Sequence, residues 1–380
     1  MGKLVGALGL AAALAILGSA ADAAEPGITA STIVLGQSAA MSGPAMELGT
    51  EMRNGAMLYF DYVNQRGGVN GRTIELRTLD DGYEPDRAVA NTRRFVDKDE
   101  AFALFGYVGT PTTLASMPVF TQAHVPLVGP FTGAEAFRKP LNRYIFNVRA
   151  SYFQETEDLV ELLTKLNLTR VAVFYQNDAY GKAGLEGVDR AMKKRKLEIV
   201  ATGTVERNSS DVAAAVAAIG KANPQAVIQI SAYKSCAAFI KAMKKAGVFA
   251  QYMNVSFVGA RALSMELGAE GRGVGISQVV PFPWNAGVPV VREYQKLVVA
   301  KTGKEAYSFT SLEGFIAAKV MVEGLRRAGR EPTRDRLVAA LETMNDYDVG
   351  GFTVTYAPTD HTGSRFVELT AIGKDGSFVR

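Results

Sequence analysis

Phe105-Gly-Tyr-Val-Gly-Thr-Pro-Thr-Thr113 and Val125-Pro-Leu-Val-Gly-Pro-Phe-Thr-Gly133 are the stretches that decide the fold. Each is a short apolar strand that runs into a turn rich in Gly, Pro and Thr. Such turns present hydroxyls and free backbone N–H groups, and a desolvated carboxylate needs several such hydrogen bonds. In open α/β sheets, ligands collect at the carboxyl ends of strands. The two turns are therefore expected to face one crevice that holds something small.

Strand-like and helix-like segments alternate around these stretches. Up to residue 148, the pattern predicts strands at 33–39, 73–79, 102–105 and 127–128, and helices at 47–65, 85–99 and 112–124. Pro85 suits the first turn of its helix, and Arg66-Gly-Gly68 ends the one before it. This order implies an α/β fold with a mainly parallel sheet and right-handed crossovers.

A second run of the same order follows residue 149. Its predicted helices cover 153–166, 182–194, 211–221 and 235–246, and its strands cover 170–175, 197–202, 226–230, 254–258 and 273–279. The chain then continues with helices at 290–301, 311–328 and 333–344 and closes on strands at 351–356 and 366–372. Because those helices follow a completed second unit, we expect them to pack back onto the first.

The amino terminus has the pattern of a secretory signal. Lys3 precedes an uncharged apolar run at 4–17, and Ala21-Asp-Ala23 fits a cleavage site, so residues 1–23 are expected to be removed near Ala23 and Ala24. The alternative is an N-terminal membrane anchor, although the run is short for a bilayer span. We expect an exported, periplasmic protein.

Composition bounds the remaining possibilities. Cys236 is the only cysteine, so no internal disulfide can form and folding must depend on packed cores. The length exceeds what one hydrophobic core usually organises, which predicts two domains. The net charge is only +4, and Lys193-Lys-Arg-Lys196 is interpreted as a solvated helix end, so no nucleic-acid partner is expected.

Several motifs, taken together and in order, resemble periplasmic solute-binding proteins of ABC importers. The resemblance is to the branched-chain (Leu/Ile/Val-type) amino-acid-binding family, which has the type I periplasmic binding protein fold. Besides the two turns, it is carried by Ala40-Met-Ser-Gly-Pro44, Asn64-x-x-Gly-Gly-Val-Asn-Gly71, Asp80-Asp-Gly82 and Asp178-x-Tyr-Gly181. It implies two Rossmann-like lobes joined by three hinge crossings, with the ligand trapped as they close. It also implies an inner-membrane permease as partner, a monomer, and no cofactor.

The resemblance places the crossings near residues 147–151, 279–282 and 349–352. Lobe 1 would then comprise residues 24–148 and 282–350, and lobe 2 residues 149–281 and 351–380.

The resemblance also assigns the carboxylate of the ligand to the two turns. Thr110 occupies the hydroxyl position of the first turn, and Phe131 and Gly133 occupy the two anchoring positions of the second. Gly133 offers only its backbone where the family usually has a hydroxyl, so Thr132 is a candidate to supply one. The alternative is that Thr110 and Thr132 stabilise a turn or cap a helix.

Three more residues are expected near the ligand. Tyr180 follows a strand end and is expected to look into the cleft, the alternative being packing beneath its own helix. Tyr233 has a similar place after the next strand. Leu48 matches a position that often carries a large aromatic residue, so a smaller residue suggests more room.

Arg261 is the main departure from the family pattern. Amino-acid binders have a glutamate at this position, which pairs with the ammonium of the ligand, whereas Arg is a partner for carboxylates. One interpretation is a ligand without an α-ammonium, or with a second acid group. The other is that Arg261 faces solvent and another acid, such as Asp178, meets the ammonium.

The sequence also bears on two other classes of function, an enzyme and a sensory binding protein. An enzyme is disfavoured because the sequence has no Gly-x-Ser-x-Gly elbow and no phosphate loop, and its only histidines, His124 and His361, form no cluster with Cys236. A sensory protein that presents the same ligand to a receptor would use the same clamp, and the sequence does not separate it from a transport protein.

Overall fold

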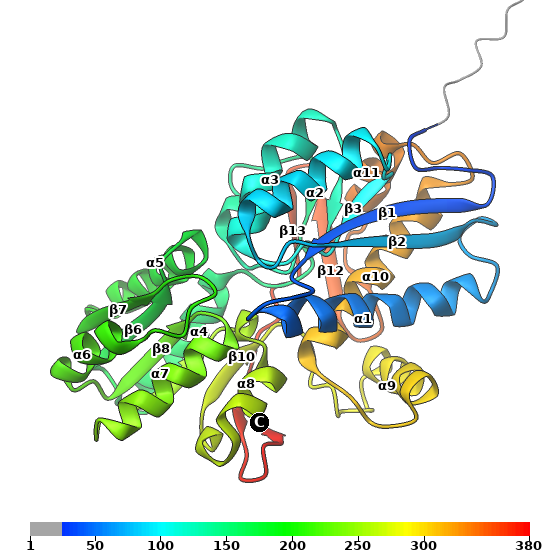
Figure 1. Cartoon of the computed structure of the whole chain (residues 1–380). Helices are drawn as coiled ribbons and strands as arrows, with labels where there is room; N and C mark the ends of the chain where they lie inside the picture. The colour runs from blue at the N-terminus through cyan, green and yellow to red at the C-terminus, as the bar shows by residue number, and fades with distance from the viewer. Residues whose placement is uncertain (1–24) are drawn as a thin grey trace, which may run out of the picture.

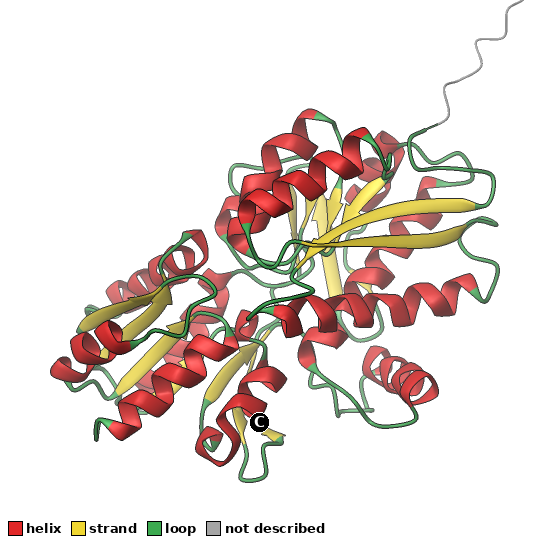
Figure 2. Ribbon diagram, in the orientation of Figure 1, coloured by secondary structure: helices red, strands yellow, loops and turns green. Residues whose placement is uncertain are grey.

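The computed structural model describes residues 25–380, which form two α/β lobes side by side (Figure 1). The expected signal segment, residues 1–23, lies outside the described residues. Each lobe is a mainly parallel sheet covered by helices on both faces (Figure 2). This confirms the two-lobed α/β fold expected from the alternating pattern.

The first lobe contains a five-stranded parallel sheet in the order β2-β1-β3-β4-β5. Its elements are β1 (Thr32–Ala39), α1 (Met46–Asn64), β2 (Thr73–Asp80), α2 (Pro85–Asp97), β3 (Ala103–Phe105), α3 (Thr110–Gln122), β4 (Leu127–Val128), the 3₁₀ turn η1 (Glu135–Phe137) and β5 (Ile145–Phe146). Strands β3, β4 and β5 are fully buried, and the two Gly/Thr turns leave β3 and β4 at the same edge.

The second lobe contains a seven-stranded sheet in the order β15-β14-β10-β9-β8-β6-β7. Its first part comprises α4 (Tyr152–Lys165), β6 (Val171–Gln176), α5 (Ala179–Lys194), β7 (Ala201–Val205), α6 (Ala213–Ala222), β8 (Ala226–Ile230), α7 (Tyr233–Lys245), β9 (Gln251–Asn254), η2 (Ser256–Val258), α8 (Ala260–Leu267), η3 (Gly268–Gly271) and β10 (Gly275–Gln278). Helix α4 begins with a capping box in which Ser151 and Gln154 satisfy each other's backbone N–H groups.

The last helices return to the first lobe, as expected. They are α9 (Pro289–Thr302), α10 (Phe309–Ala328) and α11 (Arg334–Glu342). Helix α10 packs closely along α1, because Gly55 and Gly314 let the two backbones approach. A Cβ atom on Gly314 would lie 2.2 Å from the Met52 carbonyl oxygen, so a larger residue there would push the helices apart.

Two predicted strands differ from the structure. The strand expected at 254–258 is β9, which ends at Asn254 because Ser256–Val258 forms a 3₁₀ turn that Gly259 stops with a φ of 79°. The strand expected at 197–202 begins later, as β7, where Ala201 pairs with Ala172 of β6. In both cases pairing with a neighbouring strand sets the register.

The third passage between the lobes lies later than the 349–352 expected. After β11 (Tyr347–Asp348), strands β12 (Thr353–Ala357) and β13 (Asp360–Gly363) stay with the first lobe, where the His361 carbonyl accepts a 3.0 Å hydrogen bond from the Asn147 N–H. The chain joins the second sheet only at β14 (Glu368–Ile372), followed by β15 (Phe378–Val379). Residues 351–363 therefore do not belong to lobe 2.

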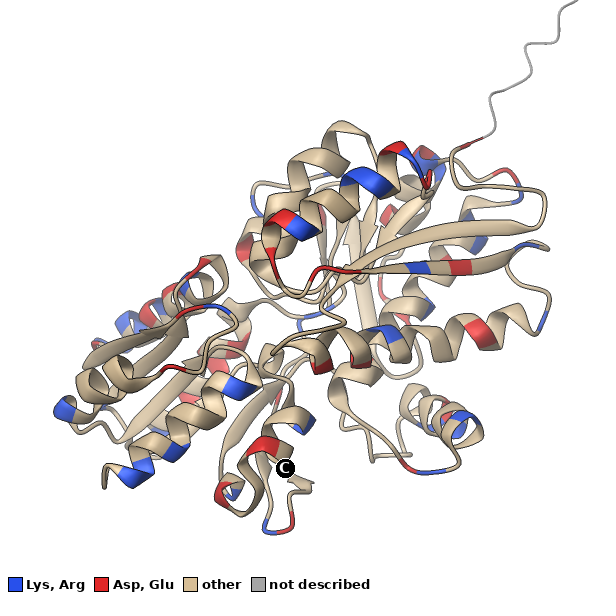
Figure 3. Ribbon diagram, in the orientation of Figure 1, with Lys and Arg blue, Asp and Glu red and all other residues tan. Residues whose placement is uncertain are grey.

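Charged residues of both signs are interspersed over the helices of both lobes (Figure 3). Within residues 25–380, every helix is too short or too polar to serve as a membrane span.

Candidate functional site

The two strand-tip turns of the first lobe meet through their threonines. Thr110 begins α3 directly after Gly109, and its Oγ1 lies 2.6 Å from Oγ1 of Thr132 in the second turn. An isolated bridge between Val108 and Phe131 holds the turns side by side. Both hydroxyls are buried, so the sequence signal that joined the two turns corresponds to a real contact.

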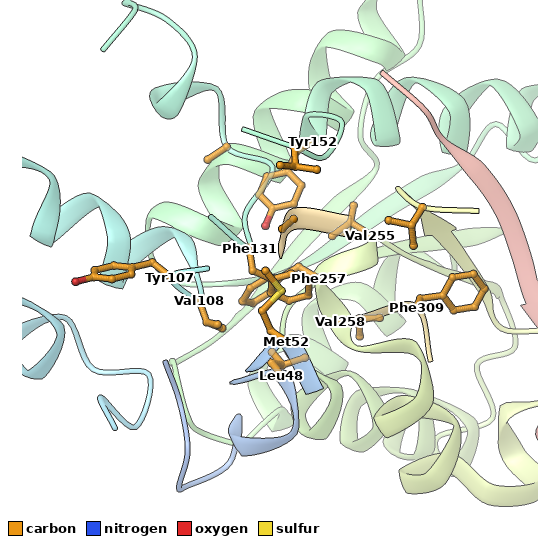
Figure 4. Close-up of a cluster of buried hydrophobic side chains, with 14 of the residues drawn as sticks. Leu48, Met52, Tyr107, Val108, Phe131, Tyr152, Val255, Phe257, Val258 and Phe309 are labelled. Atoms are coloured by element: carbon orange, nitrogen blue, oxygen red, sulfur yellow. The ribbon is translucent and has the colours of Figure 1, made fainter. Parts of the chain in front are cut away.

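Aromatic rings from both lobes close over these turns. Phe257, in η2 of the second lobe, lies 5.2 Å from the Phe131 ring and 4.7 Å from the Tyr180 ring, measured between centroids. Tyr83 of the first lobe lies 6.0 Å from Phe257. Figure 4 shows Phe131 and Phe257 together at the centre, with Tyr152 on one side and Met52 and Leu48 on the other.

Tyr152 occupies the space beside Gly133. The Tyr152 N–H donates a 2.7 Å hydrogen bond to the Gly133 carbonyl, and a Cβ atom on Gly133 would lie 2.6 Å from Cδ1 of the Tyr152 ring. A threonine at position 133 could not fit there without moving this tyrosine. Gly133 therefore lacks the hydroxyl that the family usually has at this position, and the large side chain of Tyr152 fills the space instead. The centroids of the Tyr152 and Tyr180 rings lie 5.4 Å apart.

A buried arginine lies beneath the aromatic rings. Arg149, in the first passage between the lobes, places its guanidinium carbon 5.0 Å from the centre of the Phe131 ring. Its Nη2 donates a 3.3 Å hydrogen bond to Glu155 of the second lobe, and its Nη1 lies 3.6 Å from Glu313 on α10 of the first lobe. Arg149 thus joins the two lobes through one carboxylate from each.

The two glutamates differ in their partners. Glu155 also accepts 2.7 Å hydrogen bonds from the Ser256 N–H and the Ser277 hydroxyl, which stabilise its charge. For Glu313 burial dominates, and although Arg149 opposes this effect, the pKa of Glu313 is raised to about 7.

Several buried donors at this site have no hydrogen-bond partner within residues 25–380. They are Nε and Nη1 of Arg149 and the hydroxyls of Tyr152 and Tyr180. Burial raises the pKa of Tyr152 to about 12 against the opposing influence of Arg149 and the Thr132 hydroxyl, and burial also raises the pKa of Tyr180 well above its usual value. Both phenols are therefore protonated at neutral pH, and each can donate. We call Thr110, Phe131, Thr132, Arg149, Tyr152, Tyr180 and Phe257 the cleft cluster.

Arg261 lies at the mouth of the cleft and is engaged by the opposite lobe. Its Nη1 donates a 2.8 Å hydrogen bond to Oε1 of Glu51 on α1. Asp178, the alternative acid considered for an ammonium, accepts from the backbone N–H groups of Tyr180 and Gly181 as the N-cap of α5. It also accepts from Gln176 at 2.6 Å and from Arg207 at 3.3 Å.

Leu48 and Tyr233 lie near each other at the same mouth. Both are buried, and Gly259 lies between them, since its Cβ position is 2.5 Å from Leu48 Cδ2 and 3.8 Å from Tyr233 Cδ1. Leu48 belongs to the first lobe and the other two to the second, so the lobes are in contact here.

The lobes also contact each other at a second rim of the cleft, formed by Glu84 of the first lobe and Arg207 and Asn208 of the second. Arg207 of the second lobe forms a 2.9 Å ion pair with Glu84 of the first, and Asn208 donates to Glu84 at 2.7 Å. Gln176 donates a 3.2 Å hydrogen bond to the Tyr83 hydroxyl between the rims. The structure is therefore the closed form of the two lobes.

Sequence reasoning missed Arg149, Tyr152, Glu155 and Glu313. Arg149-Ala-Ser-Tyr152 lies at a passage that was expected, and an arginine just before a helix cap was a usable signal. Glu313 stands among apolar residues of α10, where a lone carboxylate marks a buried polar site.

The fold and the site define a two-lobed protein whose buried, mixed polar and aromatic site lies between the lobes. The profile of the family described as periplasmic binding protein matches residues 32–377, and the chain belongs to that family. A substrate-binding periplasmic protein from Ralstonia solanacearum is 36% identical, with a TM-score of 0.86 over 91% of this chain and 99% of that one. A possible leucine/isoleucine/valine-binding protein from Rhodopirellula baltica is 34% identical, with a TM-score of 0.87 over 92% of this chain and 97% of that one.

A more distant relative has a more specific name. The leucine-, isoleucine-, valine-, threonine-, and alanine-binding protein of Pseudomonas aeruginosa is 22% identical, and the match covers 87% of each chain. These comparisons confirm the resemblance to the Leu/Ile/Val-binding type, and the relatives are binding proteins rather than enzymes.

Proposed function

We propose that this protein captures a small carboxylate-bearing solute between its lobes in the periplasm and delivers it to an ABC importer. The observation that carries the proposal is the cleft cluster, in which the paired threonines of the two turns of lobe 1 adjoin Phe131, whose ring packs against Phe257 of lobe 2. The names of the relatives support a small amino acid or a related acid as the ligand. The family gives the permease as partner, and the protein acts without chemical change to the solute.

Thr110, Thr132 and the Gly133 backbone are the proposed contacts on lobe 1, with Phe131 as an apolar wall. Tyr180 is the proposed contact on lobe 2, and Leu48 and Tyr233 close the mouth. Arg261 acts on closure through Glu51 rather than on the solute.

Binding works as a population shift. A solute in the cleft cluster touches both lobes only in the closed form, so it stabilises that form by the difference in contact. The ion pairs at the two rims contribute to closure without contacting the solute.

A thermal-shift panel tests the proposal. Branched-chain and aromatic amino acids, keto acids and dicarboxylates are added at a concentration near 100 times the expected Kd, where a ligand stabilises the native state by about 2.7 kcal/mol. We expect at least one to raise the melting temperature and to be recovered chemically unchanged. A panel without a stabiliser, or one in which the solute is converted, would contradict the proposal.

Two variants test whether a solute that raises the melting temperature binds at the cleft cluster. Thr110→Val should weaken binding, because the cleft loses a hydroxyl that is buried against Thr132. Thr92→Val is the matched control, since its hydroxyl is equally buried but contacts Tyr107 at 2.9 Å, outside the cleft cluster. Equal weakening by both variants would point to general destabilisation instead.

A further inference from the structure

We infer that the solute is an apolar carboxylate without an amino group, and that Arg149, Tyr152 and Tyr180 hold its carboxylate. This inference rests on the proposed function and specifies the solute class and the polar contacts of the same site. It is carried by the pattern of satisfied and unsatisfied polar groups in the closed cleft.

Within the cleft cluster, the unsatisfied buried groups are donors. Across the described chain, Arg149 Nε and Nη1 and the hydroxyls of Tyr152 and Tyr180 are buried without a hydrogen-bond partner. Buried polar groups are nearly always paired, so four unpaired donors in one place indicate a missing acceptor. A carboxylate offers two oxygens and about four lone-pair sites, which match this set, because Arg149 Nε is free and Nη1 has only the 3.6 Å contact with Glu313.

These donors belong to neighbouring side chains. The guanidinium carbon of Arg149 lies 6.0 Å from the centre of the Tyr152 ring. Tyr152 and Tyr180 have ring centroids 5.4 Å apart. Because Tyr152 and Tyr180 belong to lobe 2 and Arg149 to a passage between the lobes, closure depends on contact of the apolar body of the solute with Phe131 of lobe 1.

The acids around the cleft already have partners. Glu51 is hydrogen-bonded to Arg261 and Ser308, and Glu155 to Arg149, Ser256 and Ser277. Asp178 is occupied by Arg207, Gln176 and two backbone N–H groups. An ammonium that took one of these carboxylates as its acceptor would have to compete with those partners.

Glu313 is the acid of lobe 1 that faces Arg149, and its surroundings oppose an ammonium. Its Oε1 faces Nη1 of Arg149 at 3.6 Å, so an ammonium bound to this carboxylate would lie beside a guanidinium. Two cations this close, with little water to screen them, repel strongly. A solute without an amino group avoids that repulsion.

Apart from the paired threonines, the walls near the cleft cluster are mostly apolar. The rings of Phe131, Phe257 and Tyr83 line it, and Leu48 and Met52 close one side (Figure 4). Such walls suit a ring or a branched aliphatic body and would leave the polar groups of a second acid unpaired. Aromatic acids and branched keto acids share this chemistry, and the ligand pairs below distinguish them.

Matched ligand pairs test the solute class. Calorimetry would compare leucine with 4-methyl-2-oxopentanoate, and phenylalanine with 3-phenylpropanoate. In at least one pair we expect the acid without the amino group to bind about tenfold tighter or better, since an unpaired buried ammonium is costly. Amino acids that bind equally well or more tightly would overturn the inference but leave the proposed function standing. If neither member of any pair binds while another carboxylate of the thermal-shift panel does, the inference fails and the proposed function stands.

Variants test the residues. Tyr152→Phe and Tyr180→Phe each remove one donor and should weaken binding of the preferred acid by about tenfold. Tyr107→Phe is the control, because its hydroxyl is also buried but contacts Thr92 away from the cleft. If both cleft variants bind like the wild type, the carboxylate lies elsewhere.

Glu313→Gln tests whether Arg149 and the tyrosines hold a carboxylate of the solute or Glu313 holds an ammonium. We expect it to retain binding of the acid, because the carboxylate of the solute would be held by Arg149 and the tyrosines. If instead an amino acid binds the wild type and its binding is lost in Glu313→Gln, the ammonium meets Glu313, and the inference is overturned.

Discussion

Arg261 of the second lobe donates a 2.8 Å hydrogen bond to Glu51 of the first, directly across the mouth of the cleft. The Arg261 side chain remains 44% exposed, whereas that of Glu51 is only 11% exposed. Burial raises the pKa of Glu51, and the hydrogen bond from Arg261 opposes that rise. The second carboxylate oxygen accepts from Ser308, which caps α10. The pair therefore links the movement of α8 to helices of the opposite lobe.

Arg261→Ala should loosen closure. Opening the lobes already exposes Glu51 to water, so the variant weakens only the closed form, by about 1 kcal/mol for this half-exposed pair. We expect Kd to rise roughly fivefold and the unliganded protein to be more open by small-angle X-ray scattering. Lys301→Ala is the control, because Lys301 pairs with Asp61 at 3.1 Å within the first lobe. An unchanged Kd for Arg261→Ala would show that the pair does not act on closure.

Gly259→Ala should obstruct closure at the same mouth. Its Cβ would lie 2.5 Å from Leu48 Cδ2, so Leu48 must move for the lobes to meet, at a cost of about 1 to 2 kcal/mol. We expect calorimetry to show a several-fold rise in Kd. The double variant with Leu48→Ala should recover part of that loss, since the clash is removed.

Gly259 also has a φ of 79°, so alanine strains the second lobe by itself. Gly268→Ala provides the matched control, because its φ is 56° and its Cβ meets no atom within 4 Å. It should lower the melting temperature without weakening binding. A comparable loss of affinity in this control would attribute the Gly259 effect to backbone strain.

Glu313 should make the stability of the unliganded protein depend on pH. Its pKa is raised to about 7 in the folded state by burial, against 4.5 for an unperturbed glutamate. Between these values the folded state binds more protons than the unfolded state, so the free energy of unfolding falls as pH rises through this window. Arg149, Glu155 and Arg138 face the same carboxyl and are part of this balance.

Urea unfolding at about pH 5 and about pH 8 would measure this effect. The wild type should lose up to about 3 kcal/mol more than Glu313→Gln over this range. Asp81, whose pKa burial raises to about 6, titrates in both proteins, and its contribution cancels in the comparison. Equal slopes for the two proteins would show that Glu313 is not buried as a carboxyl in the folded state.

Trp284 should report closure by fluorescence. It is the only tryptophan, and its ring contacts Phe309 of α10 at 5.8 Å and Phe378 of β15 at 5.7 Å, between centroids. These two rings belong to different lobes, so opening must change the environment of the indole. We expect a solute that raises the melting temperature to shift the emission of Trp284. Phe378→Leu should reduce that shift, and an emission that does not respond to such a solute would contradict this placement.

Sequence patterns predicted most elements within a few residues. The helix expected at 47–65 is Met46–Asn64, and the one expected at 85–99 is Pro85–Asp97. The bounds of these helices could be predicted because local signals, such as apolar spacing and an initial proline, determine where a helix forms. Short strands such as β13 were missed, since their pairing partners lie far away in the sequence.

The sequence by itself determined that two α/β units stand in tandem and that two Gly/Thr turns end at one sheet edge. Those features follow from local periodicity and from the fixed handedness of parallel crossovers. Only the tertiary structure decided that Arg261 faces Glu51, that Tyr152 fills the space beside Gly133, and that Arg149 lies between Glu155 and Glu313. Each of these contacts joins different parts of the fold and depends on how the lobes close, which no spacing along the chain encodes.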